Sequence, residues 1–190
     1  SFLAFWHKPF MAYGHYNRKL NKFQKRTRIS SSAKLSGKSK IDLSDNVWIG
    51  HYCLLDGIGG IEIAEGVHIA SHVCIYTHSS QNSIRLLGKK FIEIPANERC
   101  GYIIKKVTIG NFTFLGTSCV ILPGVSIGKG CIIGAGSIVS KDVTDFSVVT
   151  GNPAQTNVEL AFIETVGKAL IVATIAVLDA VVQPAFVASK

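Results

Sequence analysis

The chain has 190 residues, of which 47% are hydrophobic and 17% charged, and its formal net charge is +8. This composition is sufficient for one domain with a sizeable core. Five cysteines occur without a CxxC pair, and the longest uncharged apolar run, 169–178, is too short to span a bilayer. We therefore expect no disulfide framework, no cysteine metal site and no membrane-spanning segment, and we interpret the cysteines as packing residues of a reducing compartment.

Basic residues are concentrated in residues 1–40, which contain ten Lys and Arg and no Asp or Glu. Aromatic residues are interleaved with them, among them Phe10, Tyr13 and Phe23. We expect this segment to be a cap or arm that covers the open first coil of the domain, because an uncovered β-edge invites aggregation. Contact with an anionic membrane surface is the alternative. Nucleic acid is not expected as a partner, because no nucleic-acid motif accompanies the charge.

An aliphatic residue returns at every sixth position across residues 109–139, and the residue after it is most often glycine. These aliphatic residues are Ile109, Leu115, Ile121, Ile127, Ile133 and Val139. A period of six fits neither a helix nor an ordinary strand, and it is typical of a solenoid β-helix in which three hexads form a triangular coil. Stacked coils would bury the aliphatic residues in one continuous core.

The same spacing occurs upstream, with one two-residue slip, over Leu43, Ile49, Leu55, Ile63, Ile69 and Ile75. We therefore assign residues 41–154 to the β-helix. The pattern is lost across residues 79–102, which predicts a long loop extruded from one coil directly after His78. The pattern stops again before residues 155–190, which are rich in Ala, Val, Ile and Leu and are predicted to form a helical C-terminal tail.

Two stretches of the chain resemble a known family. The first, VTIGNFTFLGTSCVILPGVSIGKGCIIGAGSIVSKDVTDFSVVTGNPA (residues 107–154), is similar to the C-terminal half of hexapeptide-repeat acetyltransferases. The likeness is greatest to sugar O-acetyltransferases of the galactoside, maltose and polysaccharide type. The second, GGIEIAEGVHIASHVCIYTHSS (residues 59–80), is similar to the segment that presents their catalytic histidine. The resemblance implies an all-β, left-handed parallel β-helix, a homotrimer, and acetyl-CoA bound between adjacent subunits.

His78 is the candidate general base, because it matches the catalytic histidine of the family. An imidazole is suited to taking a proton from an acceptor hydroxyl near neutral pH. The hydroxyl oxygen would then attack the thioester directly, so no nucleophile from the protein is required. Asp56 corresponds to an acidic residue near the family's acceptor site, where it would bind a sugar hydroxyl or orient a histidine. His51 is the second candidate for acceptor binding.

The register of the resemblance also identifies residues for acetyl-CoA. The expected cofactor-binding residues are Phe114, Gly116, Thr117, Ala135, Gly136, Ser140 and Lys141. Small residues would allow the linear pantetheine arm to approach the backbone closely, although corner geometry alone also accounts for the glycines. Lys141 would pair with a phosphate of CoA as a flexible point charge, with Lys105 or Lys106 as further candidates.

These observations predict an acetyltransferase that moves the acetyl group of acetyl-CoA to a saccharide hydroxyl of a polysaccharide, lipopolysaccharide or glycan precursor. We expect it in the cytoplasm or at the inner face of the membrane. Acetylation of an amino or nucleotide sugar, or of an antibiotic, is the alternative, and a non-enzymatic β-helix scaffold is a weaker one. A zinc enzyme of the gamma carbonic anhydrase type is disfavoured, because no histidine follows His78. No metal is expected.

Overall fold

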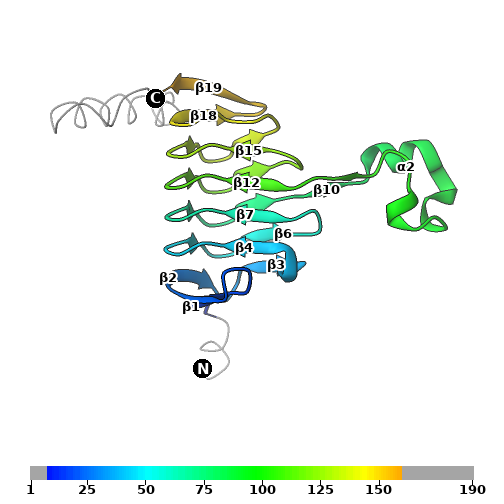
Figure 1. Ribbon diagram of the computed structural model, residues 1–190. Helices are drawn as coiled ribbons and strands as arrows, with labels where there is room; N and C mark the ends of the chain where they lie inside the picture. Colours follow the sequence, from blue (N-terminus) through cyan, green and yellow to red (C-terminus); the bar gives the residue numbers. More distant parts are fainter. Residues whose placement is uncertain (1–7, 160–190) are drawn as a thin grey trace.

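The computed structural model describes residues 8–159, which form short strands wound into a triangular solenoid (Figure 1). Parallel pairing between successive coils builds three sheets, one on each face. The first sheet contains β1 (Met11–Asn17), β2 (Lys22–Ser30), β5 (Trp48–Ile49), β8 (His68–Ile69), β13 (Phe114–Leu115), β16 (Ile132–Ile133), β18 (Ser147–Gly151) and β19 (Ala154–Glu159). The second contains β3 (Lys34–Ser36), β6 (Leu54–Asp56), β9 (Cys74–Ile75), β14 (Val120–Ile121) and β17 (Ile138–Val139). The third contains β4 (Ile41–Leu43), β7 (Ile61–Ile63), β12 (Val107–Ile109) and β15 (Ser126–Ile127).

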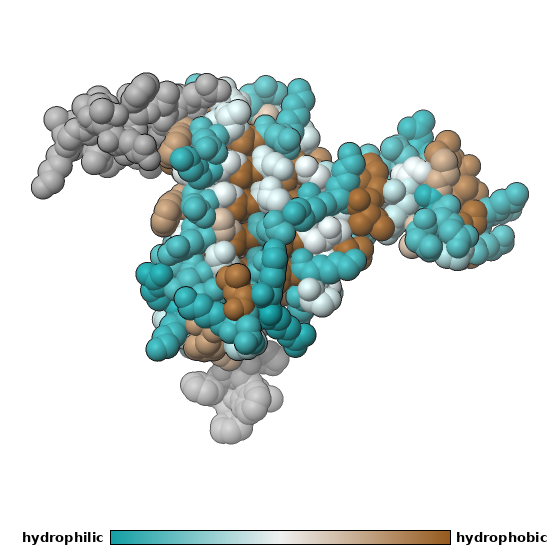
Figure 2. Space-filling model, viewed as in Figure 1, coloured by the Kyte–Doolittle hydropathy of each residue, from teal (hydrophilic) through white to brown (hydrophobic). Residues whose placement is uncertain are grey.

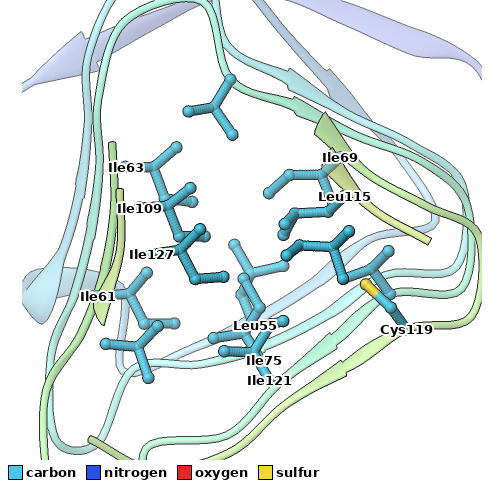
Figure 3. Close-up of a cluster of buried hydrophobic side chains, with 14 of the residues drawn as sticks. Leu55, Ile61, Ile63, Ile69, Ile75, Ile109, Leu115, Cys119, Ile121 and Ile127 are labelled. Atoms are coloured by element: carbon cyan, nitrogen blue, oxygen red, sulfur yellow. The ribbon is translucent and has the colours of Figure 1, made fainter. Parts of the chain in front are cut away.

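The core lies inside the triangle, where the aliphatic residues of the three sheets point toward one another (Figure 3). Residues of successive coils lie in register, so that Ile121 pairs with Ile75 in the neighbouring strand. Ile121 and Ile75 are both fully buried. The predicted β-helix with the sixfold residues at its centre is therefore confirmed. Cys119 is buried in the same core, and burial raises the pKa of its thiol to about 12, as suits a packing residue.

The solenoid begins earlier in the chain than the expected start at residue 41. Ile29 of β2 pairs in parallel with Ile49, and Leu35 of β3 pairs with Leu55, so residues 22–36 already supply two sides of the first coil. A single turn of 3-10 helix, η1 (Lys38–Lys40), leads into the third side. Strand β1 pairs with β2 as an antiparallel hairpin at this end of the stack (Figure 1).

The loop predicted after His78 is present as an arm that extends away from the solenoid (Figure 1). Its two ends are the paired strands β10 (His78–Ser79) and β11 (Ile103–Ile104). Between them lie α2 (Gln81–Leu87), η2 (Gly88–Ile92) and η3 (Ala96–Glu98), which the sequence pattern does not predict. The arm also carries exposed apolar side chains, so Figure 2 shows apolar surface there. Across residues 8–159, no helix is long and apolar enough to cross a membrane.

At the other end of the stack, β18 and β19 form an antiparallel hairpin. Residues 155–159, which the sequence interpretation assigned to the helical tail, therefore belong to a strand. Strand β19 pairs with β18, and β18 pairs in parallel with β16 of the coil before it. The hairpin therefore continues the first sheet. The helix expected in the remainder of the tail lies outside the described residues.

Candidate functional site

The predicted site residues lie at two corners of the triangle. We call the corner between the first and second sheets the CoA corner and the corner between the second and third sheets the histidine corner. The CoA corner and the strand that leads into it contain His51, Phe114, Gly116, Thr117, Ala135 and Gly136. The histidine corner contains Asp56, His78, Ser140 and Lys141. Strands of the second sheet separate the two corners, so one chain does not bring the two sets together.

His78 and Asp56 form a hydrogen-bonded pair at the histidine corner. Asp56 is the last residue of β6, and its carboxylate accepts a hydrogen bond from Nδ1 of His78 at the base of the arm. The Asp56 side chain is only 7% exposed, whereas the His78 side chain is 31% exposed. The bond at Nδ1 fixes the ring and leaves Nε2 as the nitrogen that is free to meet a substrate.

Thr77 holds the backbone around this pair. Its buried hydroxyl donates to the carbonyl oxygen of Asp56 at 2.5 Å and accepts from the amide of Gly59 at 2.7 Å. The amide of Thr77 also donates to the Asp56 carboxylate at 3.4 Å. These bonds tie the corner of one coil to the next coil and set the approach of Asp56 to the imidazole.

Tyr102 is a site residue that the sequence interpretation missed. Its ring stacks on the imidazole of His78, with centroids 6.0 Å apart and planes 28° apart. The Arg99 guanidinium lies 5.8 Å from the Tyr102 ring and 4.0 Å from the Phe91 ring. Arg99 thereby connects the end of the arm to the His78 stack. In the sequence, Tyr102 is only an aromatic residue near the end of the loop. The loop lacks the sixfold pattern, so the sequence does not predict where this ring lies.

The CoA corner has a close-packed, accessible backbone. A Cβ at Gly116 would lie 2.6 Å from the amide nitrogen of Ala135 in the next coil, so only glycine fits there. Gly136 donates from its amide to the carbonyl of Thr117 at 2.8 Å, and nothing lies within 4 Å of the position of its Cβ. Phe114 is 40% exposed on the strand that leads into this corner. The corner therefore offers space beside the backbone for a narrow, linear ligand.

Among the described residues, no hydrogen bond, ion pair or ring contact joins the remaining candidates to His78. His51 is at the opposite end of β6 from Asp56, and its Nδ1 is 2.6 Å from the hydroxyl oxygen of Ser30. Lys141 is exposed at the histidine corner. Lys106 forms an ion pair with Glu62, with a distance of 3.0 Å between Nζ and Oε2. Among the described side chains, no group of three His, Cys, Asp or Glu is arranged to hold a metal ion.

Comparison with known proteins connects this architecture to enzymes. Residues 106–141 match the family of bacterial transferase hexapeptide repeats (six repeats). A protein of Escherichia coli K12 assigned to lipopolysaccharide biosynthesis as an O-acetyl transferase is 31% identical over 63% of this chain and 60% of its own length. The dTDP-4-amino-4,6-dideoxy-D-glucose acyltransferase of Escherichia coli is 29% identical over 63% of this chain and 61% of its own length.

Among solved structures, galactoside acetyltransferase in complex with coenzyme A superposes with a TM-score of 0.57 and 28% identity, over 68% of this chain and 60% of that one. The chain spans about three fifths or less of the length of the curated relatives named above. The repeat match, the sequence likeness and the structural likeness agree on a left-handed β-helix. Residues 106–141 carry the hexapeptide repeats of bacterial transferases, and over about two thirds of its length the chain is similar to acetyltransferases of this kind.

Proposed function

We propose that this protein transfers the acetyl group of acetyl-CoA to a hydroxyl of a saccharide, with His78 as the general base. The observation that carries the proposal is the His78–Asp56 pair at the base of the arm, in which the hydrogen bond is made by Nδ1 and the imidazole stays partly exposed. The likeness to an O-acetyl transferase and to galactoside acetyltransferase supports the same chemistry.

In this mechanism Nε2 of His78 accepts the proton of the acceptor hydroxyl while the hydroxyl oxygen attacks the thioester carbonyl carbon. The tetrahedral intermediate collapses by breaking the carbon–sulfur bond, and the imidazolium returns its proton to the departing thiolate of CoA. The buried carboxylate of Asp56 accepts the hydrogen bond from Nδ1, which selects the tautomer with a lone pair at Nε2, and it lies beside the imidazolium that forms during the reaction. We assign Asp56 to this positioning role in preference to sugar binding, because its carboxylate already holds His78.

The acetyl-CoA site in this proposal is the CoA corner, with the pantetheine arm along Gly116, Thr117 and Gly136. Ser140 and Lys141 would face the phosphates. Two observations support this placement. The space around the Cβ position of Gly136 is empty, and the backbone at Gly116 packs closely on Ala135 of the next coil. The assignment of His51 to the acceptor stays a prediction, because the only hydrogen bond of its imidazole among the described residues is to Ser30.

Thr117→Trp should weaken the binding of CoA at least about tenfold, because an indole would fill the space beside the backbone and overpacking of this kind costs about 1–3 kcal/mol. The measurement is titration calorimetry with CoA. Ser126→Trp is the matched control, because Ser126 is exposed on the third sheet, away from the CoA corner. Equal affinity in wild type and Thr117→Trp would place the cofactor elsewhere.

We also propose that the enzyme is a homotrimer, with its sites between subunits. From the second coil onward, the outward side chains of the second sheet are half-buried and mostly apolar: Leu54, Cys74, Val120 and Ile138. The first coil places the exposed Lys34 in the same row. The outward side chains of the third sheet are polar: Asp42, Glu62, Thr108 and Ser126. An apolar sheet face of this kind is suited to contact with another copy of the chain. Such contact would bring the histidine corner of one subunit to the CoA corner of its neighbour.

The amino group of a sugar is the second candidate acceptor, because the chain is similar to an amino-sugar acyltransferase over 120 residues. An assay of CoA release from acetyl-CoA, run with a panel of acceptors, tests the hydroxyl acceptor and the amino acceptor together. The panel contains neutral glycans, amino sugars and nucleotide-linked sugars. Release that depends on hydroxyl acceptors alone supports O-acetylation, and release with amino sugars alone supports N-acetylation. Absence of release with every acceptor would contradict the proposed activity.

The hairpin β1–β2, as part of the cap, is proposed to contact an anionic membrane surface. Its exposed aromatic side chains, including Tyr13 at 73% and Phe23 at 52%, lie in the same two strands as the exposed Lys22 and Lys25. Wild-type protein should sediment with vesicles of anionic phospholipid and remain in solution with neutral vesicles. Lys22→Glu/Lys25→Glu should lower the vesicle-bound fraction by about tenfold at low salt. Equal sedimentation with both vesicle types would exclude an electrostatic contact.

A further inference from the structure

A groove of about 510 Å³ lies between the end of the hairpin and the start of the third sheet. It is lined by the residues that close β1, by η1 and β4, and by Glu62 and Lys106 from the next coils. Sites for small ligands commonly have volumes of about 300–1,000 Å³. The visible face of the solenoid is largely hydrophilic at this lower end (Figure 2).

The groove contains more positive than negative charge. Its lining has five Lys and Arg side chains against two carboxylates. Both carboxylates already form ion pairs. Nζ of Lys19 lies 3.2 Å from Oδ2 of Asp42, and Nζ of Lys106 lies 3.0 Å from Oε2 of Glu62. Among residues 8–159, neither Arg18 nor Lys38 has an acidic partner within ion-pair distance. The groove therefore presents free cationic groups suited to phosphate oxygens.

The groove adjoins the histidine corner. Lys40 in its wall donates from Nζ to the carbonyl oxygen of Ile58 at 2.9 Å, and Ile58 lies in the corner that follows Asp56. On the same side, Lys106 follows β11, whose Ile104 is the strand partner of His78. A molecule anchored in the groove would therefore have a short path along one corner to the imidazole.

We propose that the groove binds the phosphate or diphosphate of an acceptor sugar that is attached to a phosphorylated carrier. The inference rests on the proposed function and narrows its acceptor class. Arg18 and Lys38 contact the phosphate oxygens, and the sugar extends toward His78. The carrier is a nucleoside or a lipid, since both present the same phosphate chemistry. An adjoining apolar cavity of about 310 Å³ shares His15, Lys38 and Ile41 with the groove and offers room for a hydrocarbon chain.

The test is direct binding by titration calorimetry, without acetyl-CoA, of inorganic pyrophosphate, uridine diphosphate glucose and farnesyl diphosphate. Wild-type protein should bind pyrophosphate, and Arg18→Glu/Lys38→Glu should bind it at least about tenfold more weakly. Lys89→Glu/Lys90→Glu is the matched control, because it makes the same change in net charge at exposed positions of the arm, outside the groove, and should retain the affinity. Arg18→Gln/Lys38→Gln provides a milder variant, and thermal unfolding checks that each variant is folded.

Tighter binding of the nucleotide sugar than of pyrophosphate supports a nucleoside carrier, and tighter binding of farnesyl diphosphate supports a lipid carrier. Equal weakening in the groove variant and the control variant would overturn the inference, because it would show only nonspecific attraction. The absence of pyrophosphate binding by wild-type protein would overturn it as well. In either case, CoA release with neutral acceptors would still support the proposed acetyltransferase, so the two failures are distinguishable.

Discussion

Replacing His78 with alanine should lower kcat by about 10²–10⁴-fold, the usual contribution of one general base. The affinity for CoA and the oligomeric state should remain those of the wild type, because His78 lies at the histidine corner and neither forms the proposed cofactor contacts nor belongs to the solenoid core. Steady-state kinetics with a responsive acceptor, together with titration calorimetry for CoA, measures both. A kcat within about threefold of wild type would remove His78 from the mechanism.

Asp56 provides the control for this experiment, because in the proposed mechanism it acts on the substrate only through His78. Asp56→Asn should lower kcat in the wild-type background and cause little further loss in the His78→Ala background. Such non-additivity is expected when two residues act as one unit. Independent losses that add in the double variant would indicate that Asp56 contacts the acceptor itself, which is the alternative that the sequence interpretation left open.

Val120→Lys should dissociate the proposed trimer and abolish most of the activity with it. Val120 is half-buried on the outward side of the second sheet, in a row with Leu54, Cys74 and Ile138. In a symmetric assembly, each subunit would place an unpaired ammonium group in the same apolar contact, and burial of such a charge costs several kcal/mol. Light scattering after gel filtration measures the mass. The loss of activity would follow because a single chain separates the CoA corner from the histidine corner.

Thr108→Lys is the matched control, since Thr108 is half-buried at the outward position of the polar third sheet. It should leave mass and activity unchanged. The reverse pattern, with Thr108→Lys dissociating the assembly and Val120→Lys leaving it intact, would move the subunit contact to the third sheet. A wild-type protein that is monomeric and active would contradict the need for a partner subunit.

The sixfold pattern made the fold predictable, because each coil must place an aliphatic residue such as Leu115 at the same depth as its neighbours in the stack. The earlier start of the solenoid was missed, although Ile29, Leu35 and Ile41 also lie six residues apart. The surrounding lysines and arginines suggested a separate arm. Those charges point outward from strands whose aliphatic residues face inward, so charge and solenoid are compatible.

The candidate site was predictable only in part. His78 could be found from its family context, and the orienting role of Asp56 was one of two alternatives. The contact between them depends on the exact length of the corner at 57–60, which periodicity does not give. Tyr102 was not predictable, because its place beside the imidazole is set by how the arm returns to the solenoid. The pairing between β10 and β11 determines where the arm rejoins the solenoid, and the repeat pattern of the sequence does not predict this pairing.

The two ends of the arm have a consequence for how such a protein can change over time. The chain leaves the solenoid at His78 and returns at its strand partner Ile104, so the coil closes as though the intervening residues were absent. Insertions or deletions within the arm therefore leave the register of the stack unchanged, and doubling the length of a flexible loop costs only about 0.6 kcal/mol of closure entropy. The arm can therefore change in length and sequence while the stacked coils beside it keep their pairing.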